Sequence, residues 1–244
     1  MIVLPSMETD LAFFGLLIKF EFRTQFIMLI LAAALAAAGT DWLIQGHPHK
    51  ASTRLVLENW VIPAMAAVAI GVIVIRIPGG LALWIGLLLG AILLVAVLTA
   101  EFIVYDPQDP RYGHIANVLN GLALLLLLAS FLTIQVLELR ALFAIPLILS
   151  ACLIVTWRLF KLTFPEKRVW TWAFLVSFIV SQVALGLHYW PIPPLRSGFL
   201  LGLVAYLAYQ GINLHLREEV NDRSHLVEMA IVSIISLLAI LLLT

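Results

Sequence analysis

The chain has 244 residues, of which 63% are hydrophobic and 11% are charged, whereas soluble domains average about 45–50% apolar and about 25% charged residues. A water-soluble fold could not bury this much apolar surface, so lipid is expected to be the solvent for much of the chain. The 14 basic and 14 acidic residues balance, which argues against nucleic acid as a partner, because phosphate binding favours a basic face.

The N-terminal segment, residues 1–23, does not have the pattern of a cleavable signal peptide. It lacks a basic region ahead of its apolar residues, and Glu8 and Asp10 follow closely. The apolar run after them is interrupted by Lys19 and Arg23. The sequence is therefore compatible with an interfacial helix that leads into the first membrane span.

The remaining residues, 24–244, are predicted to form a single transmembrane helical domain. The fold class is all-α, a polytopic bundle of about eight spans with seven and nine as alternatives, because each crossing needs about 20 mainly apolar residues. Turn-forming sequences such as Pro191–Pro194 separate the apolar runs. The predicted spans cover residues 24–44, 55–75, 80–102, 115–137, 141–160, 169–188, 195–214 and 226–244.

The distribution of Lys and Arg predicts the orientation of this bundle, since cytoplasmic loops carry an excess of both residues. With eight spans and an external N-terminus, nine of the 14 basic residues fall on the cytoplasmic side and five on the other. We therefore expect both termini to lie outside the cell. One helix more or fewer at the N-terminal end would invert this orientation.

Polar residues gather toward the face predicted to be cytoplasmic. A carboxylate at the bilayer centre costs about 2.5–3.5 kcal/mol, so acidic residues in spans usually face the bundle interior or pair with a cation. A side chain near a helix end can also reach water, and this is the simpler explanation for polar residues at the ends of the spans. The residues predicted for an interior polar site are Glu58, Glu101, Asn117, Asn213 and Glu228.

Two pairs of amides recur at a spacing of three residues, Asn117 with Asn120 and Gln210 with Asn213. This spacing places both members of a pair on one face of a helix. Amides within a membrane form interhelical hydrogen bonds worth about 0.6 kcal/mol on average. The pairs are interpreted as such bonds, and two polar stripes that line a cavity are the alternative.

Small residues four apart allow close helix approach, and they occur at Gly86 with Gly90 and at Gly198 with Gly202. The two pairs are 112 residues apart, and at the same offset Trp60 matches Trp172. These matches suggest two four-helix halves, residues 24–137 and 141–244, as an alternative to one undivided domain.

Two loop segments resemble those of an uncharacterised family of bacterial multi-pass membrane proteins. They are residues 106–112, Asp-Pro-Gln-Asp-Pro-Arg-Tyr, and residues 188–195, His-Tyr-Trp-Pro-Ile-Pro-Pro-Leu. The resemblance implies a multi-pass protein of the bacterial inner membrane. It implies no activity and assigns no site residues.

No motif for nucleotide binding, zinc binding or a nucleophilic serine occurs in the sequence. We therefore predict no catalytic residue, no metal site and no cofactor. The favoured function is a non-enzymatic membrane component that packs with partner subunits, either other membrane proteins or copies of itself. The alternatives are a transporter or channel for small solutes or ions with its site toward the cytoplasmic face, and a membrane-embedded enzyme that uses the rim carboxylates Glu101, Asp106 and Asp109.

Overall fold

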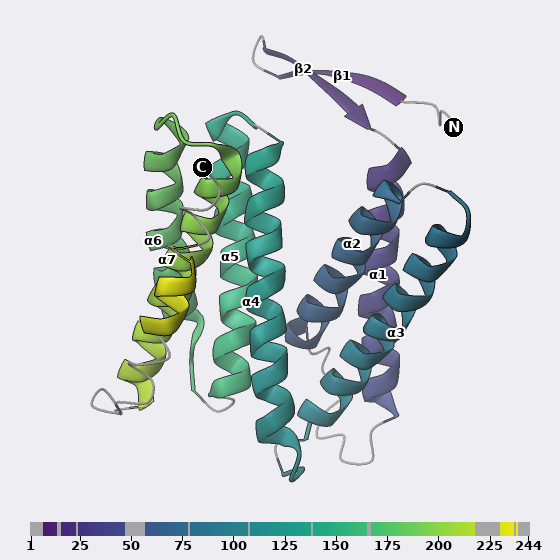
Figure 1. The fold of residues 1–244 in the computed structure, drawn as a ribbon, viewed down its shortest axis with the longest axis vertical. Coiled ribbons are helices and arrows are strands. Elements are labelled where there is room, and N and C mark those ends of the chain that lie inside the picture. The colour runs from purple at the N-terminus through teal and green to yellow at the C-terminus, as the bar shows by residue number, and fades with distance from the viewer. Residues whose placement is uncertain are drawn as a thin grey trace. The chain divides into compact units, whose positions relative to one another are not determined.

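The computed structural model contains seven helices that are long and apolar enough to cross a membrane (Figure 1). This confirms the prediction of an all-α polytopic helical bundle, with seven of the expected spans among the residues described. The chain divides into two compact units, Met1–Tyr105 and Asp106–Thr244. The residues that the structure describes are 7–13, 16–22, 24–46, 57–77, 79–106, 108–137, 139–164, 167–217, 230–236 and 238.

The N-terminal segment forms a β-hairpin, so the interfacial helix considered for residues 1–23 was wrong. Strand β1 (Met7–Phe13) pairs antiparallel with β2 (Leu16–Phe22) (Figure 1). In the second strand, apolar Ile18 and Phe20 stand on either side of Lys19. This alternation has the two-residue period of a strand and not the 3.6-residue period of a helix.

The first unit contains three spanning helices, α1 (Thr24–Gln45), α2 (Val61–Arg76) and α3 (Leu81–Val104), and a short 3-10 helix η1 (Leu57–Trp60) that leads into α2. Helix α2 packs against α1 and α3. Gly80, just before α3, has a φ of 102°, a conformation that glycine adopts without steric cost. The predicted spans over this unit agree with these helices to within a few residues.

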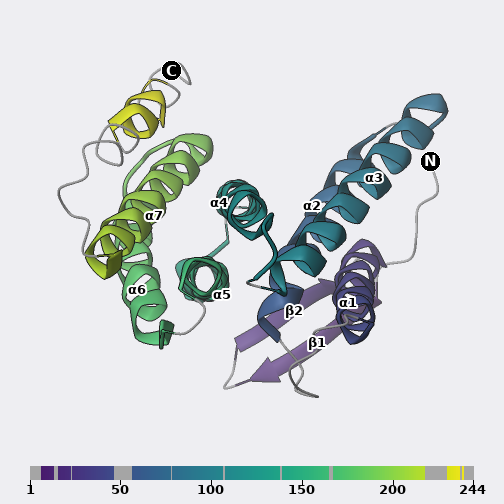
Figure 2. The same cartoon turned by 90° about the horizontal axis from the view of Figure 1, so that it is seen from below.

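The second unit is built from α4 (Tyr112–Val136), α5 (Ala141–Thr163), α6 (Trp170–His188) and α7 (Pro194–Arg217). Helix α5 packs against α4 and α6, and α7 packs against α4 and α6 as well, so the four helices form a closed bundle (Figure 2). The predicted eighth span, residues 226–244, lies largely outside the described residues, and those described within it, 230–236 and 238, are helical.

Apolar side chains occupy both the interior and the outer surface of the helices. Phe131 and Phe160 are fully buried, while Leu35, Leu88 and Leu125 are each more than 60% exposed. Soluble monomers rarely expose large contiguous apolar patches, whereas hydrocarbon accommodates them. The surface is therefore consistent with a multi-pass membrane protein.

The division between the two units falls between α3 and α4. The two suggested halves, residues 24–137 and 141–244, would instead separate α4 from α5, which pack against each other within the second unit. Helix α4 belongs with the later helices because it packs against α5 and α7.

Candidate functional site

Polar residues of the first unit lie at the end where α1 stops, α2 begins and α3 stops. Glu101, predicted as a site residue, is fully buried near the end of α3, and Glu58 is half-buried in η1. Asn59 and Thr40 are also buried, and the Thr40 hydroxyl donates to the Ala36 carbonyl oxygen at 2.9 Å. The topology thus places two of the predicted residues, Glu58 and Glu101, at one end of this unit.

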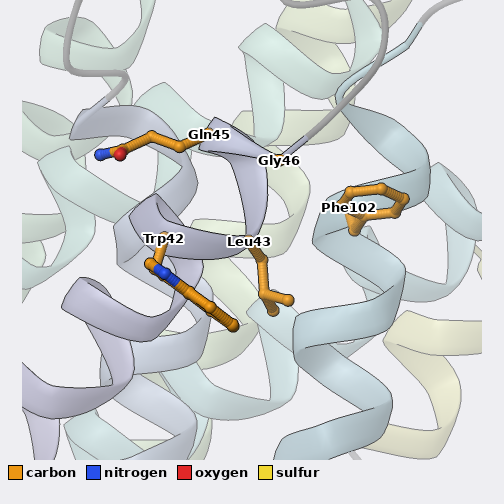
Figure 3. A pocket seen from close by; sticks show the side chains of 5 residues that line it. All are labelled: Trp42, Leu43, Gln45, Gly46 and Phe102. Atoms are coloured by element: carbon orange, nitrogen blue, oxygen red, sulfur yellow. The ribbon is translucent and has the colours of Figure 1, made fainter.

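A cavity of about 480 Å³ opens at the same end of the first unit. Figure 3 shows Leu43 and Phe102 on two different helices, with the Gln45 side chain extending away from Phe102. The Gln45 amide donates to the Asp41 carboxylate at 2.7 Å. Trp42 and Gly46 are the other lining residues among those described, and the described lining brings no polar groups together.

The second unit has a more connected polar end, where α4 begins and α5 and α7 stop. The Tyr112 hydroxyl donates to the Leu162 carbonyl oxygen at 2.8 Å. The hydroxyls of Thr163 and Tyr209 lie 3.3 Å apart, and the Lys167 ammonium, in the connection before α6, donates to the carbonyl of Leu216 at 3.0 Å. Carbonyls in the last turn of a helix have no partner within the helix, so these side chains satisfy two of them.

Three polar side chains are buried deeper in this end of the second unit: Arg158 at 5% exposed, Gln210 at 7% and Asn213 at 8%. The Asn213 amide donates to the Gln210 side-chain oxygen at 3.4 Å. Arg158 lies one helical turn before Leu162, whose carbonyl accepts the Tyr112 hydrogen bond. A buried guanidinium at this position makes this end the part of the second unit best suited to a polar ligand.

All four predicted packing glycines lie at contacts between elements of the chain. A Cβ built on Gly86 would lie 2.6 Å from the Ile77 side chain, and one on Gly90 would lie 2.5 Å from that of Ile70. In the second unit, a Cβ on Gly198 or Gly202 would lie 2.7 Å from Leu132 or 2.6 Å from Leu128 of α4. The absence of a side chain at these positions is what allows α3 and α7 to approach their neighbours.

The contacts of Gly198 and Gly202 with α4 fix an antiparallel register, which places Gln210 at the depth of Asn120 and Asn213 at the depth of Asn117. The two amide pairs therefore share one layer of the second unit. They differ in burial, since Gln210 and Asn213 are buried, Asn120 is half-buried, and Asn117 is exposed. Asn117 thus does not occupy the interior position that was expected for it.

A cavity of about 440 Å³ lies in this layer. Its wall includes the Asn120 side chain, whose Oδ1 atom is buried and has no hydrogen-bond partner. Among the residues described, no group of three or more His, Cys, Asp and Glu side chains could hold a metal ion. The cavity is lined by Pro110, Tyr112, Gly113, His114, Ala116, Asn117, Asn120, Leu162 and Thr163.

Sequence reasoning overlooked two polar residues and could not place a third. Arg158 lies inside the predicted span 141–160 but was counted with the basic residues of the cytoplasmic side, whereas α5 continues to Thr163 and the side chain is buried. Gln182 is exposed on α6, and its position as a lone amide within an apolar run was a signal available in the sequence. Glu228 lies outside the described residues.

Comparison with known proteins places the chain in a family. Residues 4–243 match the family described as "Protein of unknown function (DUF5656)". Because the match covers nearly the whole chain, the protein belongs to this family, in agreement with the resemblance to an uncharacterised family. No curated protein and no solved structure matches the chain.

Proposed function

We propose that this member of the DUF5656 family is a non-enzymatic membrane component that packs against a transmembrane partner through the outer face of α6. The observation that supports this function best is the exposure of Gln182. This residue lies three positions beyond Ile179, the centre of α6, which corresponds to a displacement of about 5 Å along the axis. The half-thickness of the hydrocarbon core is about 15 Å, so a spanning α6 holds this amide within the core.

An amide that faces hydrocarbon without a partner is costly. Transfer of an amide from water into a medium that cannot form hydrogen bonds costs about 4–8 kcal/mol. A partner helix that supplies a donor or acceptor at the depth of Gln182 removes much of this cost. Lipid tails cannot do so, which is why an exposed amide favours protein as the neighbour.

The surroundings of Gln182 suit close helix packing. Phe178, Ile179, Leu185 and Gly186 lie three or four residues away on the same helix face and are all exposed. A Cβ built on Gly186 would meet no atom within 4 Å, so its backbone is open to a neighbour. Gly86, Gly90, Gly198 and Gly202, by contrast, already contact neighbouring residues of the chain.

The partner in this proposal is a transmembrane helix of another membrane protein or of a second copy. The bilayer surrounds the rest of the helices, and the function uses neither a cofactor nor nucleic acid. The distribution of Lys and Arg supports an orientation with both termini outside, and the resemblance to bacterial multi-pass proteins supports the bacterial inner membrane.

A photo-crosslinking amino acid at Phe178 tests this proposal in membranes. We expect an adduct with protein at this position, and only lipid adducts at the control position Leu125 on α4, which is 64% exposed. The substitution Gln182→Leu keeps the face apolar, and we expect it to reduce the Phe178 adduct at least threefold. Equal adducts at both positions, or an adduct formed only within the same chain, would contradict the proposal.

Transport of a small solute or ion is the second candidate, and the polar cavity in the second unit favours it. Asn120, the lining residue furthest from the start of α4, lies eight residues into that helix, a depth of about 12 Å. A transport site in this cavity predicts that Asn120→Leu abolishes uptake into proteoliposomes while Gln182→Leu leaves it unchanged. Identical leakage from proteoliposomes and protein-free vesicles would exclude transport of the solute tested.

A further inference from the structure

We propose that the cavity between the start of α4 and the end of α5 binds the headgroup of a phospholipid. The alcohol esterified to the phosphate of this lipid carries a hydrogen-bond donor. Phosphatidylglycerol, with its hydroxyls, and phosphatidylethanolamine, with its ammonium, both have this chemistry. The proposal does not depend on the partner packing assigned to α6, because it involves a different surface of the second unit.

The outer part of the cavity lies at the depth of the headgroup region, and its inner part reaches into the adjoining hydrocarbon. Helix α4 has 25 residues and is therefore about 37 Å long, compared with about 30 Å for the hydrocarbon core. Its ends extend a few ångströms into the interface, and the lining residues are Pro110, six residues among the first nine positions of α4 and the last two of α5. The exposed residues His114 and Asn117 stand at the outer part of this wall, and Asn120 at the inner part.

The described lining of the cavity contains no carboxylate. Arg158 is 5% exposed and lies on α5 four residues before the lining residue Leu162, one helical turn away. Asp109, which directly precedes the lining residue Pro110, accepts a hydrogen bond from the Arg111 backbone N–H at 2.7 Å. We place the phosphodiester at the outer part of the cavity near His114, with the buried Arg158 as a positive charge at this end of the unit.

The inner wall requires a donor from the ligand. The Oδ1 atom of Asn120 is buried there without a hydrogen-bond partner, and a buried acceptor left unsatisfied costs about 1–3 kcal/mol. A hydroxyl or primary ammonium on the headgroup can donate to it. The quaternary ammonium of phosphatidylcholine has no hydrogen to donate, so this lipid is expected to bind less well.

The size of the cavity is sufficient for this ligand. Its volume of about 440 Å³ lies within the range of about 300–1,000 Å³ typical of small-molecule sites. The Tyr112 hydroxyl already donates to Leu162 and the Thr163 hydroxyl is close to that of Tyr209. These interactions hold α4, α5 and α7 around the cavity.

Native mass spectrometry of the full chain in mild detergent tests the proposal. The probes are phosphatidylglycerol, phosphatidylethanolamine and phosphatidylcholine with identical acyl chains. We expect the first two to remain bound at least fivefold more than phosphatidylcholine, and Asn120→Leu to remove this preference. Equal retention of all three lipids by the wild-type chain would overturn the proposal.

Two further variants separate binding from folding. Gln135→Leu removes an amide near the opposite end of α4 and should retain the lipid preference. His114→Leu changes an exposed residue, so it should fold even if Asn120→Leu does not, and we expect it to weaken retention of phosphatidylglycerol. If His114→Leu and Asn120→Leu both retain phosphatidylglycerol as the wild type does, the site is contradicted. The same conclusion follows if His114→Leu retains this lipid as the wild type does and Asn120→Leu does not fold.

Competition distinguishes a lipid from a soluble phosphate compound. Inorganic phosphate and glycerophosphoglycerol, each at millimolar concentration, should leave bound phosphatidylglycerol in place, because they lack the acyl chains that hydrocarbon retains. Displacement by either compound would identify a site for a soluble phosphate and overturn the assignment to lipid. None of these measurements involves the α6 face, so failure here leaves the partner proposal to its own crosslinking test.

Discussion

The hydroxyl of Tyr112 donates a hydrogen bond to the carbonyl oxygen of Leu162 at 2.8 Å, across 50 positions of sequence. Tyr112 is the first residue of α4, and Leu162 is the second-last residue of α5. A carbonyl so close to the end of a helix has no partner within that helix. This single bond therefore completes the end of α5 and joins it to the start of α4, beside the cavity of the second unit.

Replacing Tyr112 with Phe should lower the stability of the second unit. Removal of one such hydrogen bond costs about 0.5–1.5 kcal/mol, and the Leu162 carbonyl is left without its donor. The midpoint of unfolding in an SDS titration measures this change. Tyr189→Phe is the matched control, because Tyr189 is 77% exposed, and a midpoint shift no larger than that of the control would mean that the hydrogen bond contributes nothing.

Cys152 should resist alkylation in the folded protein. Its side chain is fully buried in α5, within hydrogen-bonding distance of Ser177 on α6, and buried thiols away from cationic groups are unreactive. N-Ethylmaleimide should label it only after denaturation in SDS. A cysteine at the exposed position Arg168, in the connection before α6, in a Cys152→Ala background, should react rapidly and serves as the control. Rapid labelling of wild-type Cys152 would show that α5 is accessible.

The spans were predictable from the sequence, whereas the pairing of helices was not. Seven apolar runs define α1 to α7 because length and hydropathy alone determine what crosses a bilayer. Counting the spans also predicted that Asn120 and Gln210 lie toward the same end of the helical bundle. Burial did not follow, because it depends on which face of a helix meets a neighbour. Asn117 and Asn120, predicted as one stripe, consequently have different exposures.

The errors have physical causes as well. An interfacial helix was expected for the N-terminal segment because charges interrupt its apolar run, but the same charges alternate with apolar residues at the two-residue period of a strand. The burial of Arg158 was not predicted, because this residue was counted with the cytoplasmic basic residues although it lies inside the predicted span 141–160. In the structure α5 runs five residues past it, and the side chain is 5% exposed. Counting Lys and Arg gives an orientation but does not show where a helix stops.

Gly198→Ala should destabilise the α4–α7 contact more than Gly202→Ala does. A Cβ at Gly198 would lie 3.1 Å from the Leu132 Cα atom in addition to its side chain, while one at Gly202 meets only the side chain of Leu128. A backbone atom cannot move aside as a side-chain methyl can, and overpacking typically costs about 1–3 kcal/mol.

The control for these two variants is Gly211→Ala on the same helix, where a Cβ would meet no atom within 4 Å. Alanine is a better helix former than glycine by about 1 kcal/mol in soluble hosts, so this change should leave stability unchanged or raise it. Unfolding of all three variants in SDS gives the order. Equal stability of Gly198→Ala and Gly211→Ala would mean that α7 does not pack closely on α4.

A pair of introduced cysteines at Leu128 and Gly202 should form a disulfide between α4 and α7. The Cβ of Leu128 lies 3.8 Å from the Cβ position built on Gly202, which is close to the mean separation of about 3.8 Å in disulfides. Cys152 is the only native cysteine, and its replacement by Ala leaves the introduced pair alone. Copper phenanthroline oxidation of membranes, followed by cleavage in the connection between α5 and α6 and electrophoresis, measures the bond.

The same experiment discriminates the observed packing from the internal repeat suggested by the sequence. Gly90 contacts Ile70 of α2, and the offset of 112 residues makes Gln182 of α6 the counterpart of Ile70. A repeat would therefore bring Gly202 against Gln182, whereas in the structure it meets Leu128 and Gln182 is exposed. We expect the cysteine pairs 70 with 90 and 128 with 202 to oxidise, and the pair 182 with 202 to remain reduced. Efficient oxidation of the pair 182 with 202 would favour the repeat. The face of α7 that carries Gly202 cannot pack against α4 and against the outer face of α6 at the same time.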